Sequence, residues 1–331
     1  MIRNVKLGII LLSFLALVFA AAEMPGQTAV VPDNQPLFDY TDKELSHNVT
    51  WIAYGDMRFT DPKETDATNP VVRKWLVDRI AEEKPDAVLL SGDVPWHGAT
   101  TADYDEYRLE TEPWRRAGIR VLPALGNHEL NGPDKAQCLE NWWSAFPALR
   151  GHRWYSVRLG ERLAILNLDS NLPLVPASEQ QRWIAAQLQA LPAKVKFVFF
   201  NMHHPPVADF QAAGDADHNA RPNEMALADM LKASPLRSRV RFVVCSGHIH
   251  NYERFLRDDV TYLVSGGAGA KPRPIVRGAD DLFQDPAPAN YHFVRFVLHD
   301  KAIDAEMVRL ADPAATHPKW EVKDRFSIAA W

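Results

Sequence analysis

VCSGHIH, at residues 244–250, is the stretch of sequence that decides how the fold is interpreted. It closes an apolar run that begins at Val240 and is typical of a strand directed into a protein core. Gly247 permits a sharp turn at the end of this run, and two histidines follow with one residue between them. Imidazole is a common metal ligand, so the pair is interpreted either as ligands in one crevice or as surface histidines in a loop.

The segments that precede this stretch favour the metal interpretation. Three apolar runs are each followed by a glycine and a metal-competent side chain: residues 51–54 before Asp56, 87–90 before Asp93, and 119–122 before Asn127. Strands that alternate with helices predict parallel pairing. The carboxyl ends of parallel strands meet at one edge of a sheet, so these side chains are expected to converge.

The spacing of apolar residues predicts the remaining elements. Helices are predicted over residues 71–81, 104–116, 137–146, 178–190 and 223–233. Strands are predicted over residues 154–159 and 163–168 as an antiparallel pair, over 195–200, over 262–264, and over 292–298 and 303–310 as a hairpin. The strand over residues 195–200 leads to His203 and His204. The pattern as a whole predicts an α/β fold.

The N-terminus has the three parts of a secretory signal peptide over residues 1–22. Arg3 and Lys6 precede an apolar run over residues 7–20, which small residues follow before Glu23. We therefore expect an exported protein, periplasmic or extracellular, with no membrane span after cleavage. The formal net charge of −5 argues against a nucleic-acid-binding surface.

The domain boundaries are predicted from composition. Residues 23–48 are expected to form an N-terminal linker, residues 49–311 the catalytic domain, and residues 312–331 a C-terminal tail. Cys138 and Cys245 are the two cysteines, and the sequence leaves open whether they form a disulfide.

The side chains gathered at the predicted strand ends are two carboxylates, one amide and several imidazoles. They are Asp56, Asp93, Asn127, His128, His203, His248 and His250. Such a set suits a pair of first-row metal ions, which at about 3.5–4 Å apart generate a hydroxide at neutral pH and clamp a phosphoryl group. A histidine that binds no metal can protonate the leaving oxygen.

The ordered motifs GD, GD, GNHE, a histidine after an apolar strand, and GHxH resemble the signature of the calcineurin-like metallophosphoesterases, over residues 50–310. The run HIHNYER at residues 248–254 and SGGAG at residues 265–269 look most like the purple-acid-phosphatase branch. The resemblance implies two packed mixed β-sheets flanked by helices, a four-layer sandwich. It also implies hydrolysis of phosphate monoesters by a metal-activated hydroxide, with Mn, Zn or Fe as the metals and a small phosphorylated substrate.

The resemblance also implies a role for each residue. Asp93 resembles the carboxylate that bridges both ions. One metal site would be completed by Asn127, His203 and His248, and the other by Asp56 and His250. His128 would stabilise the transition state or protonate the leaving group.

The sequence departs from the family pattern at two positions. Arg58 stands where the family has a histidine ligand, and Trp96 stands where the purple branch has a tyrosine ligand. His97 either fills the gap or faces solvent. Arg58 is expected to bind a phosphate oxygen, the alternative being a surface arginine paired with Asp61 or Glu64.

Other side chains near the motifs have weaker interpretations. His204 either touches the substrate or is a buried polar group, and Glu129 either supports the site or begins a helix. His218 is expected to face solvent, while Tyr252 and Arg254 are expected to pair behind the site.

Two rival functions remain open at this stage. One is a phosphodiesterase acting on nucleotide or lipid-like diesters. The other is a degenerate metal-binding protein without activity, for which Arg58 and Trp96 are the argument. The sequence does not determine the oligomeric state.

Overall fold

The computed structural model describes residues 34–211, 218–287 and 290–331. The predicted signal peptide, residues 1–22, and residues 23–33 of the predicted linker lie outside the described residues. Within the described ranges, no helix has the length and apolar character needed to cross a membrane. Export therefore stays a prediction from the sequence.

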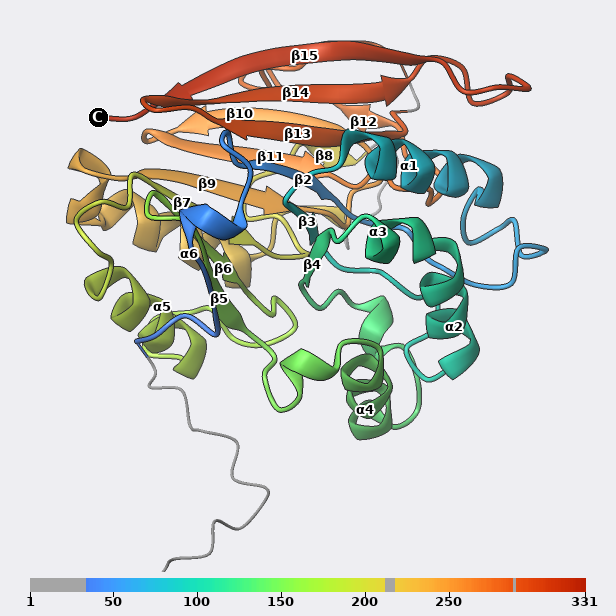
Figure 1. The fold of residues 1–331 in the computed structure, drawn as a ribbon, viewed down its shortest axis with the longest axis horizontal. Helices are drawn as coiled ribbons and strands as arrows, with labels where there is room; N and C mark the ends of the chain where they lie inside the picture. The colour runs from blue at the N-terminus through green and yellow to red at the C-terminus, as the bar shows by residue number, and fades with distance from the viewer. Residues whose placement is uncertain (1–33, 212–217, 288–289) are drawn as a thin grey trace, which may run out of the picture. The chain divides into compact units, whose positions relative to one another are not determined.

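The larger sheet has seven strands and mixed pairing (Figure 1). In spatial order it contains β1 (Phe38–Tyr40), β5 (Tyr155–Leu159), β6 (Leu163–Asn167), β7 (Phe197–Asn201), β9 (Arg241–Ser246), β11 (Val260–Ser265) and β10 (Tyr252–Arg257). Strands β6, β7, β9 and β11 run parallel, whereas β5 pairs antiparallel with β6, as predicted.

The second sheet has six strands. In spatial order it contains β15 (Trp320–Ala329), β14 (Ala302–Leu310), β13 (His292–Leu298), β2 (Thr50–Tyr54), β3 (Ala87–Leu90) and β4 (Arg120–Pro123). Strands β2, β3 and β4 are parallel, and β13 and β14 form the predicted hairpin. A short antiparallel pair joins β8 (Phe210–Gln211) to β12 (Ile275–Val276).

The helices lie close to the predicted positions. They are α1 (Pro70–Glu83), α2 (Thr101–Glu110), α3 (Glu112–Arg116), α4 (Lys135–Ala145), α5 (Glu179–Gln189) and α6 (Pro222–Ala233). The single helix predicted over residues 104–116 is divided into α2 and α3 at Thr111. Pro113 explains the break, because it lacks the N–H that an uninterrupted helix needs and is accommodated in the first turn of a new one.

Two apolar layers result from the alternation of side chains along the strands. Phe197 and Phe199 of β7 join the core between the two sheets, while Val198 and Phe200 face the layer that contains α5 and α6. In the central core Trp51 of β2 packs edge-on against Phe199 at 5.1 Å between ring centres. The two packed mixed sheets flanked by helices confirm the fold predicted from the sequence.

The predicted linker and the predicted tail each contribute one strand to a sheet, β1 and β15. Strand β1 pairs with β5, and β15 pairs with β14 along its length. The domain therefore extends beyond the predicted limits of residues 49 and 311. Both strands are edge strands, and β15 alternates partly buried and exposed positions over much of its length and carries several charged side chains. Neither strand therefore has the apolar run by which central strands are recognised.

The carboxyl ends of the parallel strands of both sheets are held together by buried polar contacts. Asn201, at the end of β7, donates from Nδ2 to the carbonyl of Leu90 at the end of β3 at 3.1 Å. Its Oδ1 accepts from the Ser91 hydroxyl at 2.8 Å. These bonds fix the edge at which the candidate site lies.

Candidate metal centre

The loops that carry the site contain non-glycine residues in the left-handed region of backbone space. Asp56, Arg58, Asp93 and His248 have φ values of 68°, 52°, 56° and 70°. This conformation is uncommon for residues with a Cβ, and it persists where surrounding bonds impose it, often at functional sites. The Asp56 N–H donates to the carbonyl of Gly92, and that of Arg58 to the carbonyl of Asp93 at 2.9 Å. The first two loops are therefore locked together.

Glu129 fixes the second and third loops. Its buried carboxylate accepts from the N–H groups of Asp93 at 3.0 Å, Val94 at 2.8 Å and Gly126 at 2.7 Å. Burial, followed by the charge of Asp93, raises the pKa of Glu129 to about 8. Of the two interpretations of Glu129, the structure supports the one in which it supports the site.

Gly126 allows the close approach of these loops. A Cβ at this position would lie 2.5 Å from the Asp93 nitrogen, 2.9 Å from Glu129 Oε2, and closer still to Asp93 Oδ1. No side chain can be accommodated there without moving the Asp93 carboxylate.

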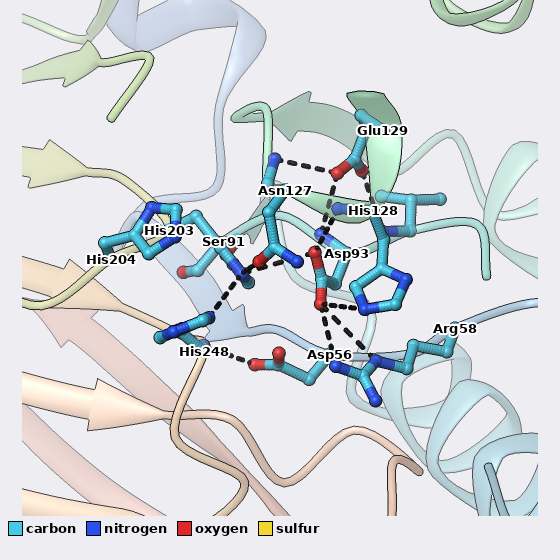
Figure 2. Close-up of polar contacts among 12 residues, drawn as sticks. Asp56, Arg58, Ser91, Asp93, Asn127, His128, Glu129, His203, His204 and His248 are labelled. Carbon is cyan, nitrogen blue, oxygen red and sulfur yellow. Dashed lines mark hydrogen bonds and ion pairs between the residues drawn. The ribbon is translucent and has the colours of Figure 1, made fainter. Parts of the chain in front are cut away.

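Four donor groups meet around His203 (Figure 2). His203 Nε2 lies 2.9 Å from Asn127 Oδ1, 3.2 Å from Asp93 Oδ1 and 3.2 Å from His248 Nδ1. His203 Nδ1 lies 2.8 Å from the carbonyl of Ser91, which can only accept, so Nδ1 carries the hydrogen. Burial lowers the pKa of His203, which leaves Nε2 with a lone pair. A lone pair and a carboxylate oxygen at this distance are stabilised by a cation between them.

Asp56 and His250 form a second group of donors. His250 Nδ1 lies 2.8 Å from the carbonyl of Lys271, so its Nε2 is left with a lone pair, 3.6 Å from Asp56 Oδ1. Neither of these two buried atoms has a hydrogen-bond partner among the described residues. Burial, with a contribution from the neighbouring Arg58, holds the pKa of His250 well below its usual range. Such orphaned atoms fit a metal site.

Asp93 lies between the two groups. Its Oδ2 is 3.2 Å from Arg58 Nη2 and 3.7 Å from His128 Nε2. Burial alone would raise the pKa of Asp93, but the neighbouring imidazoles and the Arg58 guanidinium bring it well below its usual range. The carboxylate is therefore charged and is shared between opposite sides of the site.

The structure brings all the predicted site residues together. They are Asp56, Arg58, Asp93, Asn127, His128, His203, His204, His248 and His250. Arg58 pairs with Asp93, which removes the surface interpretation in which it pairs with Asp61 or Glu64. The ring of His97 is half exposed and lies 3.5 Å from Asp103 Oδ2, which supports the interpretation in which it faces solvent.

His204 lies closer to the donors than the sequence suggested. Its Nδ1 contacts the Ser170 hydroxyl at 2.8 Å, and its ring centre lies 4.3 Å from that of His248. Its donor atom lies within 4.8 Å of those of His203 and His248, so geometry also permits it to act as a ligand. The residue is buried.

The expectation that His218 faces solvent is wrong. His218 is only 9% exposed, and its ring stacks on that of His248 with centres 4.5 Å apart and an angle of 8°. The loop that carries it has no periodicity, so its return to the site depends on tertiary packing. Tyr252 and Arg254, as predicted, pair behind the site, where both contact Asp324 of β15.

The cysteines do not meet. Cys138 and Cys245 are separate buried thiols, so the structure contains no disulfide between them.

A family model described as calcineurin-like phosphoesterase matches residues 43–252. The chain belongs to the calcineurin-like phosphoesterase family. This confirms the assignment from the sequence, and membership in this phosphoesterase family implies a metal centre of the kind that the donor groups fit. No match was found among curated proteins.

Solved structures, two of them of phosphatases, share the fold of this chain. A purple acid phosphatase, PPD1, from yellow lupin (Lupinus luteus) has a TM-score of 0.68 and 18% identity over 88% of this chain, which spans 55% of that longer one. PhoD has a TM-score of 0.60 and 12% identity, covering 86% of this chain and 70% of its own. A dimetal phosphatase from Danio rerio has a TM-score of 0.57 and 16% identity, and the match covers 90% of this chain and 100% of that one. At these identities the similarity establishes the fold alone.

Proposed function

We propose that this protein is a metal-dependent phosphatase that hydrolyses phosphate monoesters. The observation that supports the proposal most directly is the meeting of Asp93 Oδ1, Asn127 Oδ1 and His248 Nδ1 around His203 Nε2, in a chain of the phosphoesterase family. Mixed oxygen and imidazole donors suit Mn, Zn or Fe.

The metal-holding residues fall into two sets that share Asp93. Asn127, His203 and His248 would hold one ion with it, and Asp56 and His250 the other. Bound cations supply a nucleophile at neutral pH and offset charge on the phosphoryl oxygens.

The remaining site residues act on the substrate in this proposal. The Nδ1 of His128 donates to the carbonyl of Trp96 at 2.7 Å, which directs Nε2 toward Asp93 Oδ2. When the ring carries a second proton, stabilised by the Asp93 carboxylate, Nε2 would donate that proton to the leaving oxygen. Arg58 provides a permanently charged planar group for a phosphoryl oxygen. His204, on the other side of His248, is proposed as a second substrate contact.

The test is hydrolysis of an aryl phosphate by protein stripped with a chelator and then reloaded with Mn, Zn or Fe. Activity is expected to disappear on stripping and return on reloading, and to fall by at least about 100-fold in Asp93→Asn and His248→Ala. Asp300→Asn, at a fully exposed side chain, is the matched control. Undiminished activity in both site variants would exclude the proposal.

The two rivals are tested in the same samples. A phosphodiesterase would hydrolyse a bis-aryl phosphate faster than the monoester. A degenerate binding protein, the alternative raised by Arg58 and Trp96, would bind metal and hydrolyse neither substrate.

Export is a further part of the proposal, and it rests on the composition of residues 1–22. Mature protein recovered from the periplasm or medium should begin near Glu23. Recovery only from the cytoplasm, with residues 1–22 intact, would contradict it.

A further inference from the structure

The two groups of metal donors are unequal in number. The group around His203 contains four side chains, which is a complete set for an ion such as Zn²⁺. Among the described residues, the group around His250 contains Asp56, His250 and the shared Asp93, and the donor atoms of Asp56 and Asp93 also lie within 4.8 Å of that of His203. One oxygen of Asp56 in this smaller group already accepts from the His248 N–H at 2.8 Å.

Arg58 contacts the one Asp93 oxygen that remains for the smaller group. Asp93 Oδ1 faces His203, whereas Oδ2 accepts from Arg58 Nη2 at 3.2 Å and from Nε at 3.4 Å. A cation beside Asp56 and His250 would therefore compete with a guanidinium for this oxygen. Figure 2 shows the guanidinium of Arg58 on the side of Asp93 nearer to Asp56.

Arg58 is held in this position from several directions. Its N–H donates to the carbonyl of Asp93, and its own carbonyl accepts from Arg73 Nη1 at 3.1 Å. Arg73 is fully buried and paired with Glu110, so it fixes the backbone of the loop. The guanidinium carbon lies 5.0 Å from the centre of the Trp96 ring. Arg58 cannot leave the site without breaking these contacts.

We propose that the site binds two cations in unequal steps, one tightly beside His203 and one weakly beside His250, and that Arg58 causes the difference. Two effects act in the same direction. Arg58 supplies no ligand, because a guanidinium has no lone pair to donate, and its permanent charge repels a second cation across a buried site. Changes in groups that merely support ligands alter metal affinity by about 10–100-fold, so a missing ligand with added repulsion should weaken the second step by at least about 100-fold.

This inference concerns the metal site of the proposed function and rests on it, but its readout requires no substrate. Metal-free protein is titrated with Zn²⁺ by calorimetry, and saturated protein is desalted and analysed for bound zinc. The native chain is expected to retain one ion after desalting and to bind the second at least about 100-fold more weakly.

Two variants separate charge from ligation. Arg58→Gln removes the charge and should strengthen only the second step. Arg58→His removes the charge and adds an imidazole, so it should retain two ions. Arg116→Gln, at an exposed side chain, is the matched control and should behave as the native chain. Thermal unfolding in excess chelator verifies that each variant folds. If Arg58→His does not fold, Arg58→Gln alone is sufficient to test the inference.

Retention of two ions or of none by the native chain would overturn the inference. Titrations of Arg58→Gln that match the native chain would overturn it as well. Failure of the proposed function gives a different result. Stepwise metal binding without hydrolysis would support this inference and contradict the phosphatase function. Hydrolysis by a protein with two equal metal sites would support the phosphatase function and contradict this inference.

Discussion

Arg58 and Trp96, the two residues that depart from the family pattern, contact each other, with the guanidinium carbon 5.0 Å from the centre of the indole ring. The same ring stacks on His128 with centres 4.6 Å apart and an angle of 20°. One aromatic side chain therefore positions both a cation and the imidazole that we propose as proton donor. The two departures form one structural unit.

Trp96→Ala should lower kcat/KM about 10-fold on an aryl phosphate. The reason is that stacking on an imidazole and a cation–π contact are each worth about 0.5–1.5 kcal/mol, and their loss leaves Arg58 and His128 less well positioned. Trp96→Phe keeps an aromatic face and should recover most of the rate in steady-state kinetics. Equal rates for the two variants would argue against a positioning role.

Gly126→Ala should remove metal binding with little loss of secondary structure. The new methyl group would occupy the position of the Asp93 and Glu129 carboxylates. Zinc retained after desalting is the measurement. Gly118→Ala is a suitable control, because Gly118 has φ of 71° but open space around it, so it should cost about 1 kcal/mol of stability without changing the zinc content. Full zinc retention by Gly126→Ala would show that the loops can move apart.

His292 should make the metal-free protein less stable in acid. Its ring is buried, with Nδ1 2.7 Å from the carbonyl of Asn290, and burial lowers its pKa to about 4. In the unfolded chain His292 takes up a proton near pH 6.5, but in the folded chain it does so only near pH 4. The contribution of neutral His292 to the stability of the fold is therefore complete above pH 6.5. About 3 kcal/mol of stability is lost as the pH falls between these values.

Urea unfolding of the metal-free protein from pH 4 to 7.5 measures this loss. His292→Gln should be less stable at pH 7 but show a smaller decline toward pH 4 than the native chain. The stability of His299→Gln, a substitution at a partly exposed ring, should decline with pH in parallel with that of the native chain. Identical slopes for His292→Gln and the native chain would contradict the assignment.

Asp324→Ala should destabilise the domain by about 2–3 kcal/mol. Asp324 accepts from the Tyr252 hydroxyl at 2.9 Å and from Arg254 Nε at 2.6 Å, and its removal leaves Arg254 without this partner in a largely buried position. Thermal unfolding measures the loss, with Asp300→Ala as the exposed control. An unchanged midpoint would mean that the contacts of Asp324 with Tyr252 and Arg254 do not stabilise the domain.

The part of the site that could be predicted from the sequence lies at the ends of parallel strands. Asp56, Asp93 and Asn127 follow apolar runs and glycines, and parallel strands end at one edge, so their convergence follows from local pattern and topology. The same holds for His203 and His248, which follow β7 and β9. The apolar runs in the sequence also predict the central strands of the two mixed sheets.

The remaining features depend on contacts between distant segments. His218 lies in a loop whose composition indicates only irregular structure, and its stacking on His248 is set by packing. The partner of Arg58 was sought nearby, at Asp61 or Glu64, but the left-handed backbone at Arg58 turns its side chain toward Asp93 instead. Edge strands such as β15 expose one face and so lack a continuous apolar signal.

The position of β2 has a consequence for how the molecule is made. This strand, which leads to Asp56, pairs on one side with β3 and on the other with β13, where Ala53 faces Val294. A nascent chain still attached to the ribosome near residue 290 would have an open edge at a largely buried strand. Pairings between such distant segments form slowly and expose unpaired strands meanwhile. Acquisition of metal should accordingly be a late event, after release of the complete polypeptide.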